Sequence, residues 1–448
     1  MAYASLRERL TTYKRLLELP RRAYLLGGTS RLSDIPRVLL AAREAPAQVD
    51  AYHDAIRAAL GVRHVFSYGS GRMGLYELLR ALDVRAGDEV ILPGYTCVVM
   101  PAAILRLGAR PVYADIDEAT LNVKVDAVAA AITPRTRVIL AQHTFGIPCD
   151  LDALQALATR HGLHLIEDGA HALGASYHGT PCGQFGVAAL FSTEKSKMIS
   201  TEKGGLVTTN DDALAARLRT SWEALPQDDP ERVRRALGRW ILFDVERLPR
   251  LGELAEFVDR HGLRRFGRLR NALEAIEHYD DVEYAEALQV KLREPFPARL
   301  APALALVGRL QAGRLAADVA RRNRLARRLA AAAERHGWTV PRIDWEGTQP
   351  SFIRFPFLVD GRRGWMKALR RARIEPGTWL NHPMHPAGSD FEACGYRPGL
   401  CPTADRVAER IVNLPLHPRV GDWMVEAVEG LGGPIPDDGP APLRNEES

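Results

Sequence analysis

A segment rich in hydroxyl groups and lysines, residues 191–205, is the part of the sequence best suited to covalent chemistry. It begins Phe-Ser-Thr-Glu-Lys-Ser-Lys and ends in Gly204-Gly205. A lysine amine forms an imine with an aldehyde once it has lost its proton, which a desolvated or cation-flanked site favours. The hydroxyl of Ser192 could hold a phosphate at the same place. Residue types alone leave three candidates for the reactive amine, and a solvated surface charge is the ordinary role of each: Lys195, Lys197 and Lys203.

A glycine-rich turn, Gly69-Ser70-Gly71-Arg72-Met73-Gly74, offers an anion site between an expected strand and an expected helix. Free backbone N–H groups and the positive end of the helix dipole attract negative charge there. The turn matches the GxGxxG pattern of dinucleotide-binding proteins, but that class needs an acidic residue at the end of the next strand. The next strand, 89–92, ends in Pro-Gly-Tyr-Thr. The sequence therefore predicts a single phosphate at this turn, with an unliganded tight turn as the alternative.

Two adjacent carboxylates, Glu167 and Asp168, close an apolar strand. Strand alternation sends their side chains to opposite faces, so one can enter a site while the other faces covering helices. A buried carboxylate needs a cationic partner, and a protonated pyridine nitrogen would be one. The alternative role for these carboxylates is to cap a helix or to form a salt bridge. The chain thus presents a glycine-rich turn, then an acid at a strand end, then a lysine about 29 residues after that acid. This order suits a cofactor with a phosphate, a pyridine nitrogen and an aldehyde.

Short apolar runs that alternate with helical segments must position these groups. Continuous apolar strands between helices are typical of a buried, mostly parallel sheet, and ligands bind such sheets at the carboxyl ends of the strands. Helices are expected over 72–82 and 151–161, and further strands over 64–68 and 351–359. The apolar runs are 89–92, 111–114, 137–141, 163–167, 188–192 and 206–208.

Composition and length narrow the class of protein. The 448 residues suit two domains, and a net charge of +5 argues against nucleic-acid binding. Five scattered cysteines without CxxC pairs indicate reduced thiols in a cytoplasmic protein. No apolar run approaches the roughly 20 residues of a membrane helix. Residues 6–26 mix Leu and Arg at roughly helical spacing; we expect an arm that packs on its own protein or on a dimer mate, with an amphipathic helix at a membrane surface as the alternative. We expect no metal, because Pro383 lies between His382 and His385 and no third ligand is nearby.

Four stretches of the chain resemble the DegT/DnrJ/EryC1/StrS family of sugar aminotransferases, in the aspartate aminotransferase superfamily. They are residues 87–93, 142–150, 166–174 and 191–205, and a weaker resemblance extends over 295–432. The resemblance implies the α/β fold type I of pyridoxal phosphate enzymes. It suggests a large domain with a mostly parallel mixed sheet flanked by helices over 61–300 and a smaller C-terminal α/β domain over 301–432. It also implies a helical insertion at about 215–290. The residue pattern itself predicts a helical arm over 1–60, and a composition rich in Pro, Gly and Asp predicts a disordered tail over 433–448.

The resemblance assigns roles to individual residues. The Schiff-base lysine lies six positions after Phe191 and seven before Gly204, which makes it Lys197. Asp168 would pair with the pyridine nitrogen, and His171 would lie beside the phenolic oxygen of the ring. The phosphate would be bound by Ser70, Gly71, Arg72 and Ser192. The substrates would lie near Tyr95, His143, Phe145, Arg299, His382 and His385.

The sequence departs from the family pattern at three positions. Arg72 stands where Thr is usual, and a charge-assisted contact could still hold phosphate. Cys97 stands where an aromatic residue stacks on the ring; Cys cannot stack, so Tyr95 becomes a candidate. Pro297 stands where the partner subunit usually supplies an Asn to the phosphate.

The activity that the resemblance implies is transfer of an amino group from a small amino donor, expected to be L-glutamate, to a keto acceptor. The acceptor would be a keto-sugar, often nucleotide-linked, or a cyclitol, and the enzyme would be a homodimer with a ping-pong mechanism. Two alternatives stay open: dehydratase-type or other chemistry with pyridoxal or pyridoxamine phosphate, which Lys197 disfavours, and a non-catalytic regulatory relative.

Overall fold

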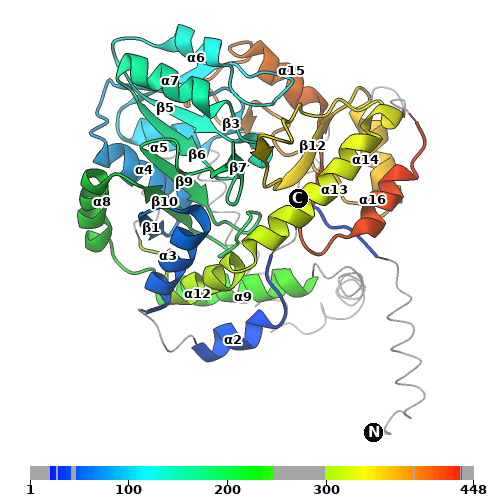
Figure 1. Cartoon of the computed structure of the whole chain (residues 1–448), viewed down its shortest axis with the longest axis horizontal. Coiled ribbons are helices and arrows are strands. Elements are labelled where there is room, and N and C mark those ends of the chain that lie inside the picture. Colours follow the sequence, from blue (N-terminus) through cyan, green and yellow to red (C-terminus); the bar gives the residue numbers. More distant parts are fainter. Residues whose placement is uncertain are drawn as a thin grey trace, which may run out of the picture.

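The computed structural model describes residues 21–26, 29–41, 47–246, 298–386, 389–433 and 435. A seven-stranded sheet in the order β1-β10-β9-β6-β5-β2-β4 forms the centre of the large domain (Figure 1). The strands from β9 to β4 are parallel, and β10 is antiparallel to both of its neighbours. The predicted mostly parallel mixed sheet is confirmed. Its strands are β1 (His64–Tyr68), β2 (Glu89–Pro93), β4 (Arg110–Ala114), β5 (Thr136–Gln142), β6 (His164–Asp168), β9 (Ala188–Ser192) and β10 (Gly205–Thr209).

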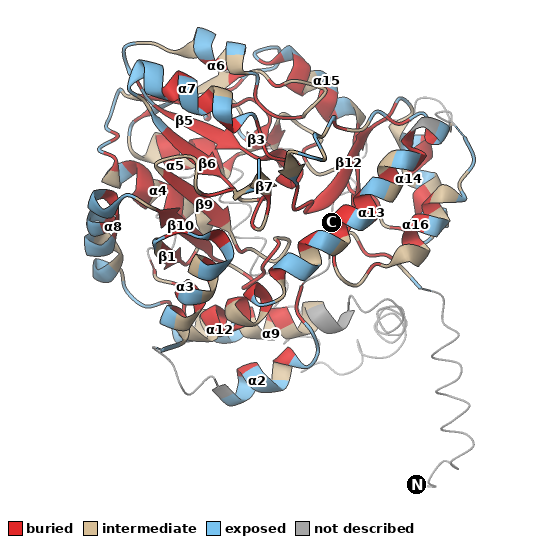
Figure 2. Ribbon diagram, viewed as in Figure 1, coloured by how far each residue is buried: buried red, intermediate tan, exposed pale blue. Residues whose placement is uncertain are grey.

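Helices cover both faces of this sheet, and the strands are buried almost throughout (Figure 2). Val90 and Leu92 pack on one face, whereas Ile91 between them packs on the other, as the period of two requires. The first face is covered by α4 (Gly71–Ala81), α5 (Val99–Arg106) and α8 (Asp212–Ala224). The second face is covered by α3 (Ala47–Leu60), α6 (Val125–Ala131), α7 (Leu151–His161) and α12 (Pro302–Ala312).

A second, smaller core forms in the C-terminal part of the chain. Its two-stranded antiparallel sheet joins β12 (Arg354–Leu358) to β14 (Ile411–Pro415). Trp338 stacks on Phe357 with 3.9 Å between ring centroids, and Trp365 packs edge-on against Trp338. The helices of this part are α13 (Leu315–His336), α14 (Arg362–Arg371), α15 (Pro402–Arg410) and α16 (Asp422–Glu429). The expected strand over 351–359 is shorter because only residues 354–358 have a partner strand.

Local signals explain where the helices that position the site begin and end. The Ser70 hydroxyl accepts a hydrogen bond from the backbone N–H of Met73 at 3.2 Å and caps α4. Asp150 caps α7 through the N–H of Ala153 at 3.0 Å, and Gly162 ends it with φ 63°. Such caps contribute about 1 kcal/mol each. The predicted span of α7, 151–161, is confirmed.

Short strands join distant segments around the sheet edge. Strand β13 (Met384–His385) pairs in parallel with β3 (Thr96–Cys97), which brings His385 opposite Cys97. A three-stranded ribbon contains β7 (Ser176–Tyr177), β8 (Thr180–Pro181) and β11 (Thr348–Gln349), and η1 (Thr144–Gly146) is a single 3-10 turn.

The N-terminal segment is extended where it is first described. Residues 21–26 are not helical, contrary to the expectation for 6–26, because the backbone of Ala23 bonds to the small domain. Its N–H donates to Arg373 O at 3.0 Å, and its carbonyl accepts from the N–H of Glu375 at 2.8 Å. The chain then forms α2 (Asp34–Ala41), which lies near α9 (Pro230–Glu246) and α12 (Figure 1).

Several predictions fall on residues that lie outside the described ones. These are the helix over 6–20, the part of the insertion from 247 onward, Pro297 and most of the expected tail. Within the part of the chain that is described, none of the helices combines the length and apolar character needed to cross a bilayer.

Candidate functional site

A cavity of about 550 Å³ opens at the carboxyl edge of the large sheet, between that sheet and residues of the small domain. Parallel strands end at this edge, which is where ligands bind in such sheets. Nine residues that the family resemblance places in the site line the cavity together, although they come from five separate stretches of the chain. They are Ser70, Gly71, Arg72, Cys97, Asp168, His171, Ser192, Lys197 and His385.

The start of α4 and the end of β9 form a cradle for an anion. Gly71 lies against Ser192, and a β-carbon added to Gly205 would come within 2.4 Å of the Gly71 Cα. The close backbone approach of β10 to α4 therefore requires glycine at position 205. The Nε atom of Arg72 is buried and has no hydrogen-bond partner among the described residues. A cation and a helix N-terminus that meet at one point suit a phosphate.

The two strand-end carboxylates separate as predicted. Asp168 faces the cavity, where burial raises the pKa of its carboxyl; the N–H of Ala170, 3.0 Å away, and Lys197 oppose that rise. Glu167 points to the other side of β6. Its two oxygens accept hydrogen bonds from the backbone N–H groups of residues 183, 185 and 186. Asp168 is therefore available for chemistry, while Glu167 anchors a loop.

His171 lies on the cavity wall with an unused ring nitrogen. Its Nδ1 atom is buried without a hydrogen-bond partner within the described chain. Burial and the nearby charges of Lys197 and Arg354 hold the pKa of the ring well below its ordinary value, so the imidazole is neutral. Its centroid lies 4.3 Å from that of Trp379.

Lys197 follows β9 in a tight turn, with its backbone N–H donating to Glu194 O at 3.0 Å. Its Nζ atom lies over the ring of Trp379, 4.6 Å from the centroid. Burial is the largest influence on its amine and, with the positive charge of Arg354, lowers the pKa, although Glu194, Cys97 and Asp168 act in the other direction. A lowered pKa increases the fraction of free amine at neutral pH, which a nucleophile requires.

Two cavity residues, Arg354 and Trp379, had no role in the sequence-based prediction. The Arg354 guanidinium lies 4.4 Å from the centroid of Trp379 and donates to Asn413 Oδ1 at 3.3 Å. It is 6% exposed, and burial lowers its pKa to about 10. It forms no ion pair with any carboxylate among the described residues, so it can receive an anion. Trp379 lies three residues before His382 in the sequence and was assigned no role there.

The remaining predicted residues lie apart from the cavity lining. Tyr95 and Phe145 are fully buried in an apolar cluster, with Phe145 edge-on behind Trp379 at 6.0 Å. Arg299 places its guanidinium 5.1 Å from the ring of Trp222. His382 lies 6.2 Å from Phe391. His143 is enclosed behind β6.

His143, Glu167 and Cys182 place possible metal ligands within 4.8 Å of one another. Hydrogen bonds occupy the histidine nitrogens: the N–H of Cys149 donates to His143 Nδ1 at 3.2 Å, and Nε2 bonds to Glu167 at 3.2 Å. The ring therefore carries its proton on Nε2 and has no lone pair left for a metal. The group holds β5, β6 and the loop over 183–186 together.

The cavity residues fit the cofactor that the sequence implies. The orphaned Arg72 Nε and its glycine cradle match a phosphate, and the buried Asp168 carboxylate matches a protonated ring nitrogen. The unpartnered Nδ1 of His171 can meet a further ring substituent. Cys97 lines the cavity, and burial raises the pKa of its thiol, so it presents a neutral surface.

A sheet of this strand order with a second small domain beyond its carboxyl edge is the architecture of fold type I pyridoxal phosphate enzymes. The profile of the DegT/DnrJ/EryC1/StrS aminotransferase family matches residues 44–232 and 249–430, and the chain belongs to that family. Residues 233–248, within the segment expected to be an insertion, lie between the two matched stretches.

Individual relatives agree with this assignment. GDP-perosamine synthase from Caulobacter vibrioides is 42% identical over 159 residues, which span 36% of this chain and 43% of that relative. The aminotransferase TlmJ from Streptoalloteichus hindustanus has a similar fold, with a TM-score of 0.68 at 24% identity, covering 91% of this chain and 97% of that one. A putative sugar aminotransferase from Streptococcus pneumoniae also has a TM-score of 0.68, at 20% identity, covering 91% of this chain and 96% of its own.

Proposed function

We propose that the protein is a pyridoxal phosphate-dependent aminotransferase that transfers an amino group from an amino acid to a keto-sugar. One observation carries the proposal: the amine of Lys197, the carboxylate of Asp168 and the anion cradle at Ser70 line a single cavity in a member of an aminotransferase family. The bound cofactor would supply an aldehyde for attachment and a ring that stores the electrons of a broken C–H bond.

Each group of cavity residues has its own role in the proposed reaction. Ser70, Gly71, Arg72 and Ser192 would bind the phosphate, and Asp168 would hold a proton on the pyridine nitrogen. Lys197 would carry the cofactor; once the donor displaces it, its Nζ would be the general base that removes the proton from the α-carbon of the donor and, in the second stage, the general acid that delivers a proton to the former keto carbon of the acceptor. The face of Trp379 and the small-domain residue His385 exclude water, and burial lowers the pKa of His385 to about 3, so that it is neutral.

Arg354 is the group best placed for the carboxylate of the amino donor. Its guanidinium is buried, faces the cavity and forms no direct ion pair with a carboxylate in the described residues, although the charges of Glu194 and Glu375 act on it. A substrate carboxylate would give this buried charge a direct partner. We infer L-glutamate as the donor. We also infer a two-stage reaction in which the keto acid leaves before the acceptor binds. The protein is further inferred to be a homodimer in the cytoplasm.

The acceptor is inferred from relatives. The Caulobacter relative is a synthase of GDP-perosamine. We therefore infer a keto-sugar, with a nucleotide-linked one as the first candidate. A dehydratase-type reaction on the same scaffold is the alternative, and the retained Lys197 speaks against it.

Two half-reactions test the proposal on the purified, cofactor-loaded protein. L-Glutamate should change the visible spectrum of the cofactor and release 2-oxoglutarate, and a panel of keto-sugars should restore the spectrum while amino sugars appear by mass spectrometry. A protein that converts glutamate but aminates no sugar of the panel would refute the acceptor class. A protein that releases sugar dehydration products instead would support the alternative.

A further inference from the structure

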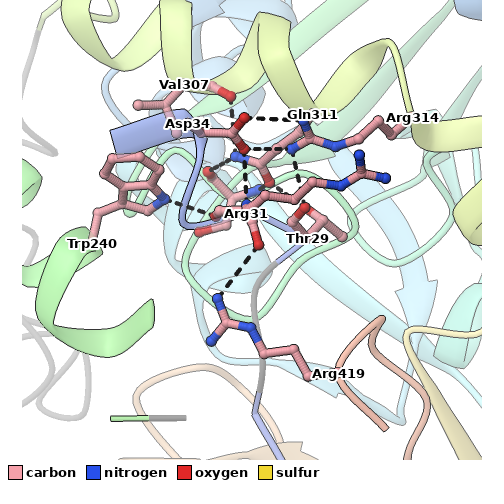
Figure 3. Close-up of polar contacts among 10 residues, drawn as sticks. Thr29, Arg31, Asp34, Trp240, Val307, Gln311, Arg314 and Arg419 are labelled. Atoms are coloured by element: carbon pink, nitrogen blue, oxygen red, sulfur yellow. Dashed lines mark hydrogen bonds and ion pairs between the residues drawn. The ribbon is translucent and has the colours of Figure 1, made fainter. Parts of the chain in front are cut away.

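Two segments outside the family profile pack against each other. The profile begins at residue 44 and omits residues 233–248, so the N-terminal segment 21–41 and most of α9 lie outside it. Trp240 of α9 donates from Nε1 to the Ser30 hydroxyl at 2.8 Å, and it packs with Val38 in a small apolar cluster. Figure 3 shows Trp240 directed at the N-terminal segment, which also bonds to Gln311 and Arg314.

Both segments reach the cavity. Leu26 from the N-terminal segment and Arg239 from α9 line it together with Lys197. Arg239 is 8% exposed, and its Nε donates to Glu202 Oε1 at 2.9 Å. Residues outside the two profile-matched stretches therefore supply part of the cavity wall, including a buried guanidinium.

Glu202 has a strained backbone at this wall. Its φ is +67°, a conformation that only glycine adopts without cost, yet it is 5% exposed and carries a carboxylate. Strain of this kind at a cavity points to a side chain needed for its chemistry. Here the side chain orients Arg239.

The charges on this wall are neutralised in pairs. Arg239 is paired with Glu202, and Lys203, which also lines the cavity, is paired with Asp228 at 2.7 Å. Arg72 and Arg354, by contrast, form no ion pair within the described chain and suit anions. A guanidinium beside a carboxylate offers donors and acceptors side by side, which matches hydroxyl groups, because each hydroxyl both donates and accepts.

We propose that Arg239, oriented by Glu202, is a specificity-determining residue that binds hydroxyl groups of the sugar acceptor. The inference rests on the proposed aminotransferase function and adds to it the place where the sugar is recognised. The N-terminal segment supports α9 through Trp240 and thereby holds Arg239 at the cavity.

The test compares Arg239→Gln with Arg234→Gln, a matched change at an exposed arginine on the same helix. The probe is GDP-perosamine, which runs the sugar half-reaction in reverse; its binding is also measured by calorimetry. We expect Arg239→Gln to raise the KM and the Kd for the sugar at least ten-fold while the glutamate half-reaction changes less than two-fold. Arg234→Gln should match the wild type in both.

Glu202→Gly is the second variant, because it removes the carboxylate and relieves the backbone strain at once. It should still fold and bind cofactor, with the loss of the buried ion pair partly offset by the relief of strain, and it should show the same loss of sugar affinity. Asp83→Gly, an exposed position with φ +59°, controls for backbone relaxation and should leave both half-reactions unchanged.

The outcomes separate the inference from the function it rests on. Unchanged sugar kinetics in Arg239→Gln and Glu202→Gly, or equal losses in both half-reactions, would overturn the specificity role alone. If the wild type responds to glutamate but neither binds GDP-perosamine nor aminates any sugar of the panel, the acceptor class and this inference both fall.

Discussion

The amine of Lys197 lies where burial and a neighbouring guanidinium both oppose its protonation. Its position over Trp379 leaves the nitrogen free of any direct salt bridge among the described residues. Three lysines could carry the cofactor by their residue type alone, and all three line the cavity. Substituting each of them in turn identifies the one that is covalently attached.

Lys197→Ala should abolish covalent cofactor attachment. Borohydride should fix cofactor on the wild type, on Lys195→Ala and on Lys203→Ala, but not on Lys197→Ala, as peptide mass spectrometry would show. Turnover should fall by about 10²–10⁴-fold, because the general acid–base group is lost. Retained covalent attachment in the Lys197 variant would contradict the assignment.

Ionisation of the buried Asp168 carboxyl should lower the free energy of unfolding of the cofactor-free protein as the pH rises. Burial raises the pKa of this carboxyl in the folded state, so ionisation costs stability once the pH exceeds the unfolded value, about 3.9. Cofactor-free Asp168→Asn should therefore be more stable than cofactor-free wild type at pH 7, and the difference should shrink towards pH 4. Urea unfolding across this range measures it. A constant difference at all pH values would argue against a buried ionised carboxylate.

Arg354→Gln should weaken donor binding and leave the fold intact. We expect the KM for L-glutamate to rise about ten-fold or more, since a charge-assisted contact to a carboxylate contributes about 1.5–3 kcal/mol. Arg327→Gln is the matched control, because Arg327 also lies over a tryptophan ring, Trp345, at 4.2 Å but is absent from the cavity lining. Equal effects of the two changes would point to lost stacking rather than lost carboxylate binding.

At the scale of elements, the contact between β10 and the start of α4 decides the shape of the anion cradle. Gly205→Ala should reduce cofactor affinity at least ten-fold and destabilise the protein by about 1–3 kcal/mol, because the new β-carbon would displace Gly71. Gly313→Ala has open space around the added carbon and controls for the loss of a glycine. Cofactor titration and thermal unfolding measure both effects; normal cofactor affinity in Gly205→Ala would show that the cradle tolerates the shift.

The elements were largely predictable because their signals are local. Apolar runs placed the strands within one or two residues, and a capping Asp150 with Gly162 bounded α7. Arg354 and Trp379 escaped prediction because they reach the cavity from the small domain, and no local pattern records that meeting. The extended conformation at Ala23 was missed for the same reason, since its partner lies about 350 residues away.

At the scale of the whole molecule, the N-terminal segment connects the two cores. Ala23 bonds to the small domain, while Asp34 pairs with Arg314 at 2.7 Å beside α12 (Figure 3).

Asp34→Asn should lower the free energy of unfolding by about 3 kcal/mol, because Asp34 is buried and Arg314 would lose its partner. Asp54→Asn, in an exposed pair with Arg57, should cost less than about 1 kcal/mol. Equal small losses in denaturant titrations would mean that the segment contributes little to stability.

The same segment has a consequence for the order of folding. Residues 23 to 34 are synthesised well before their partners Arg314, Ile374 and His417, which follow at least 280 residues later. Contacts of such long sequence separation form late, after local elements have assembled. The N-terminal segment can therefore dock only onto a nearly completed chain. Its docking brings Ser30 against Trp240 of α9, so a nascent molecule would complete the proposed sugar-binding surface at Arg239 late in folding.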